Sequence, residues 1–407
     1  MGAIVQADPY QGLIRKIGYS VGLEDIVNRV KKLVSLYVQD RSISFGAFSD
    51  LVEKDFGRQR SATKHFVDFY GTLNLIRGVG RDLEPLYQLD SLSILKRILT
   101  SNEDKYDTAL KVVLTQCIIE ADGDIFLNGL LSDFQPDQMR SRLEAMVQAK
   151  RHQVTKEMRS PHLLAKIYQT INIKNESTDE KAGAAGAPPQ GRFARRLEPL
   201  DSLRRTSQLT PPTNLETVVI PQDYLKKASK TRKAWAQELG LFQDGKKTEH
   251  GKQLLRNLEG RIISKSAGDT AVLFWGYKSD LDIVNLKLQT KIEAYDCEAW
   301  DLLCAIGRAH DHSGSSSLVP ALNSDEVIDF LQNILTLYRE GNSSKGLIRN
   351  SLPLYIAEPV LAAWCISEAH QLPDLHAILE EEYGKKQHRR VQLMNIRGTA
   401  GALFFMS

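Results

Sequence analysis

The sequence predicts a mainly α-helical protein with short β-hairpins, divided into several compact units by a disordered linker. Three observations predict this fold class. At about 150 residues per domain, the length of 407 residues corresponds to two or three domains. The composition, 42% hydrophobic and 25% charged, is that of a globular protein. Most apolar residues recur at the helical spacing of i, i+3, i+4 and i+7.

Composition and charge exclude several classes of protein. No apolar run approaches the ~20 residues that span a bilayer, and residues 1–20 lack the apolar core of a signal peptide. We therefore expect a cytoplasmic protein without a membrane partner. The four cysteines form no C-x-x-C pair, so neither a disulfide framework nor structural zinc is expected. The net charge of +3 is too small for the whole surface to attract a polyanion, so any nucleic-acid interface must be local.

The clearest break in the chain is a segment rich in Gly, Pro and charge that contains Ala182-Gly-Ala-Ala-Gly-Ala-Pro-Pro. Such a segment has too few apolar residues to bury, which predicts a flexible linker. The predicted divisions of the chain are a first unit at 1–100, a helical extension at 101–173, the linker at 174–217, a second unit at 218–260 and a mainly helical domain at 261–407.

The first unit is recognised by the order of its predicted elements. Apolar periodicity predicts helices at about 23–38, 44–55 and 62–73, and strands at 73–76 and 83–89 joined across Arg77-Gly-Val-Gly-Arg81. Three helices followed by a β-hairpin is the order of a winged helix-turn-helix. In the third helix, Phe66, Phe69 and Tyr70 share one face and are expected in the core.

The second unit contains a more specific pattern. Leu239-Gly-Leu ends a predicted helix, Asp244-Gly245 is a dipeptide favoured in two-residue hairpin turns, and Thr248 can cap a helix with Leu254, Leu255 and Leu258 inside. This run resembles the wing of many bacterial and archaeal winged-helix proteins, over about 35 residues. It departs from that pattern at Lys247, where a leucine is usual. The resemblance implies a nucleic-acid-binding or protein-interaction module.

The remaining segments are predicted to be mainly helical. Helices are expected at 91–99, 106–131, 138–159 and 162–173, with 109–119 at the centre of a helical core. Beyond the second unit, the pattern predicts helices at 325–340 and 375–383, a buried apolar segment at 359–366, and paired strands at 391–394 and 402–405. This repeats the order of helices and hairpin, so 261–407 is a candidate for a third winged-helix-like unit.

Local clusters of cations in the predicted modules are the candidate nucleic-acid contacts. Winged helices usually place the third helix in the major groove and the wing against the backbone. The candidate residues are Arg58, Arg60, Lys64, His65, Arg77 and Arg81 in the first unit, and Lys226, Lys227, Lys230, Arg232, Lys233, Lys246 and Lys247 in the second. The alternative is that these residues are ordinary solvated helix faces. The basic run Lys385–Arg390 follows a predicted helix end, where the helix dipole favours cations in any case.

Signals of catalysis are weak. No G-x-x-x-x-G-K-[ST] loop occurs, and Gly78-Val-Gly80 lacks the third glycine of a dinucleotide-binding loop. His310-Asp311-His312 has no partner at ligand spacing, and the acidic group Glu120, Asp122 and Asp124 is expected to end a helix. A metal-dependent nuclease would need a carboxylate and lysine cluster, for which the candidates are Asp280, Asp282, Lys287, Lys291 and Glu293. No catalytic residue, metal ligand or cofactor is predicted.

These observations favour a non-catalytic subunit that binds double-stranded DNA or acts as an adaptor for other protein subunits. The resemblance implies a setting such as a prokaryotic regulatory or antiviral defence complex. A protein-only scaffold and a metal-dependent nuclease with its site in 261–407 remain the alternatives.

Overall fold

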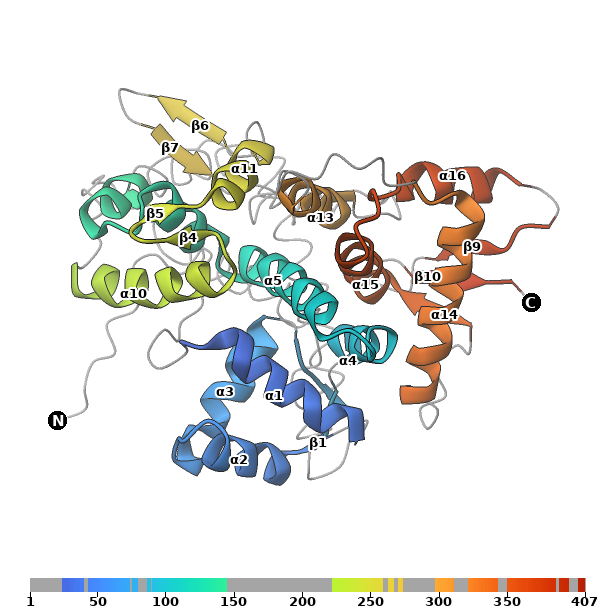
Figure 1. Cartoon of the computed structure of the whole chain (residues 1–407), viewed down its shortest axis with the longest axis horizontal. Helices are drawn as coiled ribbons and strands as arrows, with labels where there is room; N and C mark the ends of the chain where they lie inside the picture. Colours follow the sequence, from blue (N-terminus) through green and yellow to red (C-terminus); the bar gives the residue numbers. More distant parts are fainter. Residues whose placement is uncertain are drawn as a thin grey trace, which may run out of the picture. The chain divides into compact units, whose positions relative to one another are not determined.

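The computed structural model describes residues 24–39, 43–73, 75–79, 86–88, 90–144, 222–258, 263–266, 270–273, 297–310, 321–342, 350–385, 388–394 and 402–406. These residues are mainly helical, with a few small antiparallel strand pairs (Figure 1). This confirms the predicted mixture of helices and short hairpins. The chain divides into a larger unit of Ile17–Ala121, Lys233–Glu259 and Glu293–Ser407, and a smaller unit of Met1–Lys16, Asp122–Arg232 and Gly260–Ile292. The predicted linker at 174–217 lies outside the described residues.

The larger unit begins with three helices that the sequence predicted. Helix α1 (Ile26–Gln39) buries one apolar stripe, which includes Val30, Leu33 and Val34. A two-residue strand, β1 (Ile43–Ser44), leads into α2 (Phe45–Lys54), where the Ser44 hydroxyl accepts a hydrogen bond of 3.2 Å from the Ala47 amide and caps the helix. A short 3-10 turn (Arg60–Ala62) precedes α3 (Thr63–Thr72), whose Phe66, Phe69 and Tyr70 are buried as expected.

The hairpin after α3 differs from its predicted position. Strand β2 is Arg77–Val79 and strand β3 is Leu86–Gln88, so Gly78 lies within a strand and not in a turn. The predicted strand at 73–76 was wrong because this apolar run closes the helix: the Leu75 amide donates to the Tyr70 carbonyl at 2.9 Å, and Leu73, Leu75 and Ile76 are buried. The sheet has the order β1-β3-β2, and the sequence had not predicted β1.

Helices α4 (Asp90–Ile98) and α5 (Glu103–Leu131) follow the hairpin. Within the larger unit, α4 packs against α1 and against two later helices, α14 (Ser324–Asn342) and α15 (Leu354–Ser367). Two ion pairs lie in the same region: Arg97 of α4 lies 2.5 Å from Glu340 of α14, and Lys105 of α5 pairs with Glu368, just after α15. Helix α4 therefore connects the beginning of the larger unit with its end. The predicted core segment 109–119 is almost wholly buried.

The segment with the wing-like pattern forms the predicted helix, hairpin and helix. These are α10 (Gln222–Glu238), β4 (Phe242–Gln243), β5 (Lys246–Lys247) and α11 (Glu249–Asn257). Gly240, Asp244 and Gly245 all have positive φ, as a helix end followed by a tight hairpin turn requires. The Thr248 hydroxyl accepts a hydrogen bond of 3.1 Å from the Gly251 amide and caps α11.

The C-terminal part of the larger unit repeats the connectivity of its N-terminal part. After α13 (Cys297–His310) come α14, β8 (Ser351–Pro353), α15, α16 (Leu375–Gly384), β9 (Val391–Met394) and β10 (Ala402–Phe405). The sheet order β8-β10-β9 matches β1-β3-β2, because the last strand is central in both sheets. We call residues 26–88 the N-terminal repeat and residues 324–405 the C-terminal repeat. The predicted pairing of 391–394 with 402–405 is confirmed.

The smaller unit contains α5 from Asp122 onward, a helix over 136–144, α10 as far as Arg232, and the strand pair β6 (Ile263–Ser266) and β7 (Thr270–Leu273). Pro136 is the first residue of its helix, a position that needs no amide donor. Phe126 and Phe134 meet edge to face at 6.5 Å in this core. None of the helices in the described part of the chain combines the length and apolarity needed to span a bilayer.

Gly251 provides a test of the helix and hairpin packing. A Cβ atom at Gly251 would lie 2.1 Å from the Leu241 carbonyl oxygen, which is backbone and cannot turn aside. We expect Gly251→Ala to destabilise the protein by about 1–3 kcal/mol through this overpacking. Urea unfolding followed by circular dichroism measures the effect.

Gly46→Ala is the matched control, since a Cβ there meets only the Ser44 hydroxyl at 3.7 Å. In helix α2 this change should leave stability unchanged or raise it by about 0.5–1 kcal/mol. Equal unfolding midpoints for the two variants would contradict the close approach of α11 to the backbone of Leu241.

Candidate nucleic-acid interface

The cations beside helix α3 are exposed, but they are not equivalent. Arg58, Lys64 and His65 are exposed on or just before α3. Arg60 is also exposed, yet its Nε lies 2.6 Å from Glu53 Oε2, and its guanidinium pairs with Asp50 as well. The hydrogen bond and charge of Glu53, with the charge of Asp50, raise the pKa of Arg60. Two carboxylates of α2 therefore neutralise Arg60, and Arg58 and Lys64 carry the positive field of this surface.

For two further candidates of the first unit, Arg77 and Arg81, the structure gives no side-chain position. Arg77 begins strand β2, so its backbone lies in the hairpin as a wing residue requires. The structure does not describe its side chain, and Arg81 lies outside the described residues.

Helix α10 presents three of its predicted lysines to solvent. Lys226, Lys227 and Lys230 are exposed, and the i, i+4 spacing of Lys226 and Lys230 puts them on one stripe of the helix. Lys233 is half-buried, with its Nζ 5.6 Å from the centre of the Phe242 ring, so its charge is partly committed to a cation–π contact. On the hairpin, Lys246 is exposed and Lys247 is half-buried.

Arg232 does not belong to this surface, which corrects the prediction. Its side chain is 0% exposed and makes two hydrogen bonds to Asp122, from Nε at 2.8 Å and from Nη2 at 2.6 Å. Burial alone would lower the pKa of Arg232, but the carboxylate of Asp122 more than compensates, so this pKa is raised. The helix turns Arg232 inward, away from the exposed stripe of Lys226 and Lys230.

The partner of Arg232 sits at a break in helix α5. Asp122 has φ −135° and ψ 15°, so the helix is interrupted there and not ended, as the acidic group had suggested. Its side chain is also 0% exposed. The sequence signal for this pair was the triplet Asp122-Gly-Asp124 inside an apolar helix. A carboxylate buried in such a helix requires a cation or several hydrogen-bond donors as partners. Nothing in the sequence indicated which of the many cations would pair with it.

His310, the one described member of the His310-Asp311-His312 group, belongs to a half-buried pair. It is the last residue of α13, and its ring centre lies 4.2 Å from that of His250 on α11. Burial lowers the pKa of both imidazoles, and to about 3 for His310, where the charges of His250 and Lys111 add to the effect. The two rings therefore pack as neutral groups between the helices.

The remaining candidates are those for metal chemistry and the cysteines. No group of three or more His, Cys, Asp or Glu side chains suited to a metal ion occurs among the residues that the structure describes. The nuclease candidates Asp280, Asp282, Lys287, Lys291 and Glu293 lie outside these residues. Cys117 and Cys365 are buried, and burial raises the pKa of the Cys365 thiol to about 12.

The chain matches no protein-family model, no curated protein and no solved structure.

The buried Asp122–Arg232 pair predicts a strong coupling between two residues 110 positions apart. Arg232→Met leaves the Asp122 carboxylate buried without its guanidinium, which should destabilise the protein by about 3–5 kcal/mol. Arg232→Met with Asp122→Leu should recover most of this loss, because no charge is then left buried. Urea unfolding of the single and double variants measures the coupling energy.

Lys230→Met on the exposed stripe of the same helix is the control and should change stability by less than about 0.5 kcal/mol. A double variant whose loss equals the sum of the two single losses would show that the pair is not coupled.

The His250–His310 pair predicts a stability that depends on pH. The pKa of His310 is about 3 in the folded chain, whereas an unfolded histidine titrates near its ordinary 6.5. Below that value the unfolded chain binds the extra proton, so the stabilising contribution is present above pH 6.5 and is lost as the pH falls toward 3. The loss approaches about 1.4 kcal/mol per pH unit for one such group.

His310→Gln should flatten this slope in unfolding measurements between pH 7 and pH 4, and the exposed His388→Gln should not. An unchanged slope in His310→Gln would show that the pair does not remain neutral on acidification.

Proposed function

We propose that the chain is a non-catalytic subunit that binds double-stranded DNA through winged-helix modules and connects it to other protein subunits. The observation that carries this proposal is the N-terminal repeat. Its order α1-β1-α2-α3-β2-β3, with β3 central in the sheet, is the connectivity of a winged helix. In such modules α3 enters the major groove and the β2–β3 hairpin contacts the backbone.

The charges of the N-terminal repeat support the same function. Arg58, Lys64 and His65 are exposed where α3 begins, at the end of the helix that usually contacts base edges. Each lysine or arginine that neutralises a phosphate releases a condensed counterion, so even a few contacts give measurable, salt-dependent binding.

Helix α10 and its hairpin are the proposed second contact. The sequence of α10, β4, β5 and α11 resembles the wing of prokaryotic winged-helix proteins, and Lys226, Lys227, Lys230 and Lys246 are exposed on it. A regulatory or antiviral defence complex is the setting that this resemblance suggests. The described part of residues 218–260 is one helix, a hairpin and another helix, which is less than a complete winged helix. The proposal for this segment therefore rests on its exposed lysines.

A protein-only scaffold is the second candidate function, and one observation favours it. Asp50 and Glu53 neutralise Arg60, so the surface beside α3 is less basic than its sequence suggests. A weakly charged module of this kind suits packing against a partner subunit.

Binding to a duplex of about two helical turns tests the proposal. Fluorescence anisotropy between about 50 and 200 mM salt should show affinity that falls with salt. Arg58→Glu with Lys64→Glu should lower the affinity at least tenfold and reduce the slope of log K against log salt by about 2, since each phosphate contact contributes about 0.9. Lys226→Glu with Lys230→Glu should also weaken binding.

Arg308→Glu with Arg339→Glu is the matched control, because it changes the net charge equally at exposed sites on α13 and α14. If the control loses as much DNA affinity as Arg58→Glu with Lys64→Glu does, the loss reflects the change in net charge and not a contact made by α3. Absence of salt-dependent binding by the unmodified chain would favour the scaffold.

A further inference from the structure

The C-terminal repeat places helix α16 where the N-terminal repeat has α3. Each is the third helix of its repeat, and each is followed by a hairpin whose second strand is central in the sheet. A polyanion that used both repeats in the same way would therefore meet α3 in one and α16 in the other.

The two helices carry opposite charge on their exposed faces. Helix α3 presents Lys64 and His65 to solvent. Helix α16 contains Glu380, Glu381 and Glu382 in succession, and the side chains of Glu380 and Glu381 are 72% and 63% exposed. Glu381 lies 3.9 Å from the Lys385 ammonium and Glu380 lies 3.3 Å from the His376 ring, so each carboxylate has a neighbour on or beside α16 and still faces solvent. A phosphate backbone approaching α16 would meet these two exposed carboxylates.

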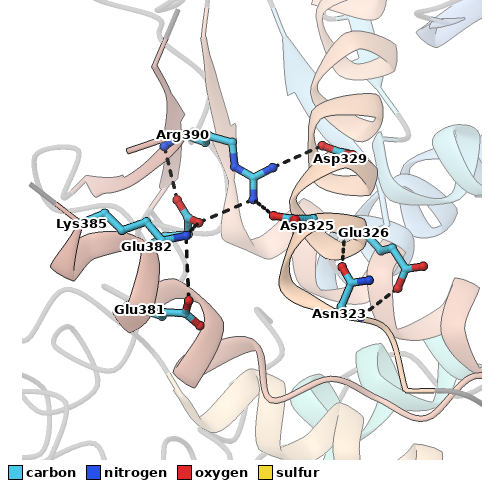
Figure 2. Close-up of polar contacts among 8 residues, drawn as sticks. All are labelled: Asn323, Asp325, Glu326, Asp329, Glu381, Glu382, Lys385 and Arg390. Atoms are coloured by element: carbon cyan, nitrogen blue, oxygen red, sulfur yellow. Dashed lines mark hydrogen bonds and ion pairs between the residues drawn. The ribbon is translucent and has the colours of Figure 1, made fainter. Parts of the chain in front are cut away.

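The cations that follow α16 are held by groups of the same repeat. Figure 2 shows Arg390, just before β9, reaching Asp325 at 2.5 Å and Asp329 at 3.6 Å on helix α14. Its guanidinium also lies 3.6 Å from Glu382, which is 1% exposed and pairs with Lys385. The same carboxylate accepts a hydrogen bond of 3.3 Å from the Arg390 amide. Two cations, Arg390 and Lys385, thus face three carboxylates, so the cluster keeps a net negative charge, and Arg390 ties α16 to α14.

Arg389 is engaged in a different way. Its Nη2 donates to the Tyr383 carbonyl at 2.7 Å, its Nε donates to the Lys385 carbonyl at 3.2 Å, and its guanidinium lies 4.8 Å from the centre of the Tyr383 ring. These carbonyls lie at the C-terminal end of α16, where the helix dipole favours a cation, as the sequence had indicated for this basic run. The positive charge of Arg389 therefore serves to end the helix.

We infer that the two repeats have different roles: the N-terminal repeat takes the polyanion, and Glu380 and Glu381 on α16 keep the C-terminal repeat off it. This inference rests on the proposed function for the N-terminal repeat and specifies which of the two similar modules performs it. The exposed carboxylates are the determinants, because the acidic side chains around α16 outnumber the cations. Asp325, Asp329, Glu380, Glu381 and Glu382 stand against Lys385, Arg389 and Arg390.

Charge reversal in the full chain tests this role. Glu380→Lys with Glu381→Lys should create a second polyanion-binding face, raise the affinity for duplex DNA severalfold and steepen the salt slope by up to about 2. Glu103→Lys with Asp104→Lys at the exposed start of α5 changes the net charge equally and is the control. A gain in affinity cannot arise from unfolding, which circular dichroism would also detect.

A second pair of variants separates the inference from the proposed function. Arg389→Gln should leave DNA affinity unchanged, whereas Lys64→Gln should lower it. If Arg389→Gln weakens binding as much as Lys64→Gln does, the inference is wrong and DNA binding itself stands. If only the Glu380→Lys, Glu381→Lys chain binds DNA, the proposed function fails and the role of the two glutamates stands. A gain no larger than that of the α5 control, or no binding by any variant, overturns the inference.

Discussion

The pairing of cations with nearby carboxylates decides which surfaces of this chain can attract a polyanion. With 53 basic and 50 acidic residues, the net charge gives no direction to its field. An exposed lysine without a close carboxylate acts over about one Debye length, near 8 Å at physiological salt, whereas a paired arginine presents little more than a dipole. Arg60 and Lys64 lie four residues apart in the N-terminal repeat, yet their charges are not equally available to a polyanion. Arg60 contacts Glu53 and Asp50, and Lys64 does not.

The small sheets depend on the helices that cover them. Strands of two to four residues cannot form a stable hairpin alone. In the C-terminal repeat, α14 and α15 pack against β8, α16 packs against β9, and most side chains of α15 are buried. Helix α4 then packs against both α1 and α15, so the two repeats share one core within the larger unit. A change in either repeat that loosens these contacts therefore affects the other repeat as well.

The buried Asp122–Arg232 pair imposes a different constraint on the smaller unit. Both groups lose their hydration, a penalty of several kcal/mol per ion, and the two hydrogen bonds between them recover much of it. The pair also selects one rotation of α10 about its axis, with Arg232 inward and Lys226 and Lys230 outward. The position of the exposed lysine stripe is therefore a consequence of this internal ion pair.

The amino-acid sequence by itself determined most of the elements. Apolar periodicity defined α1, α3 and α14, and the Asp244-Gly245 turn and Thr248 cap defined the hairpin between α10 and α11, because these signals are local. The strand β1 was missed, since two residues form a strand only through their pairing with β3. The sequence likewise did not determine which cations are paired and buried and which are exposed. Arg232 and Lys230 lie two positions apart with similar neighbours in sequence, and only the tertiary structure brings Asp122 to one of them. Charge pairing acts through space between residues far apart in the chain, so it becomes visible only once the helices are packed.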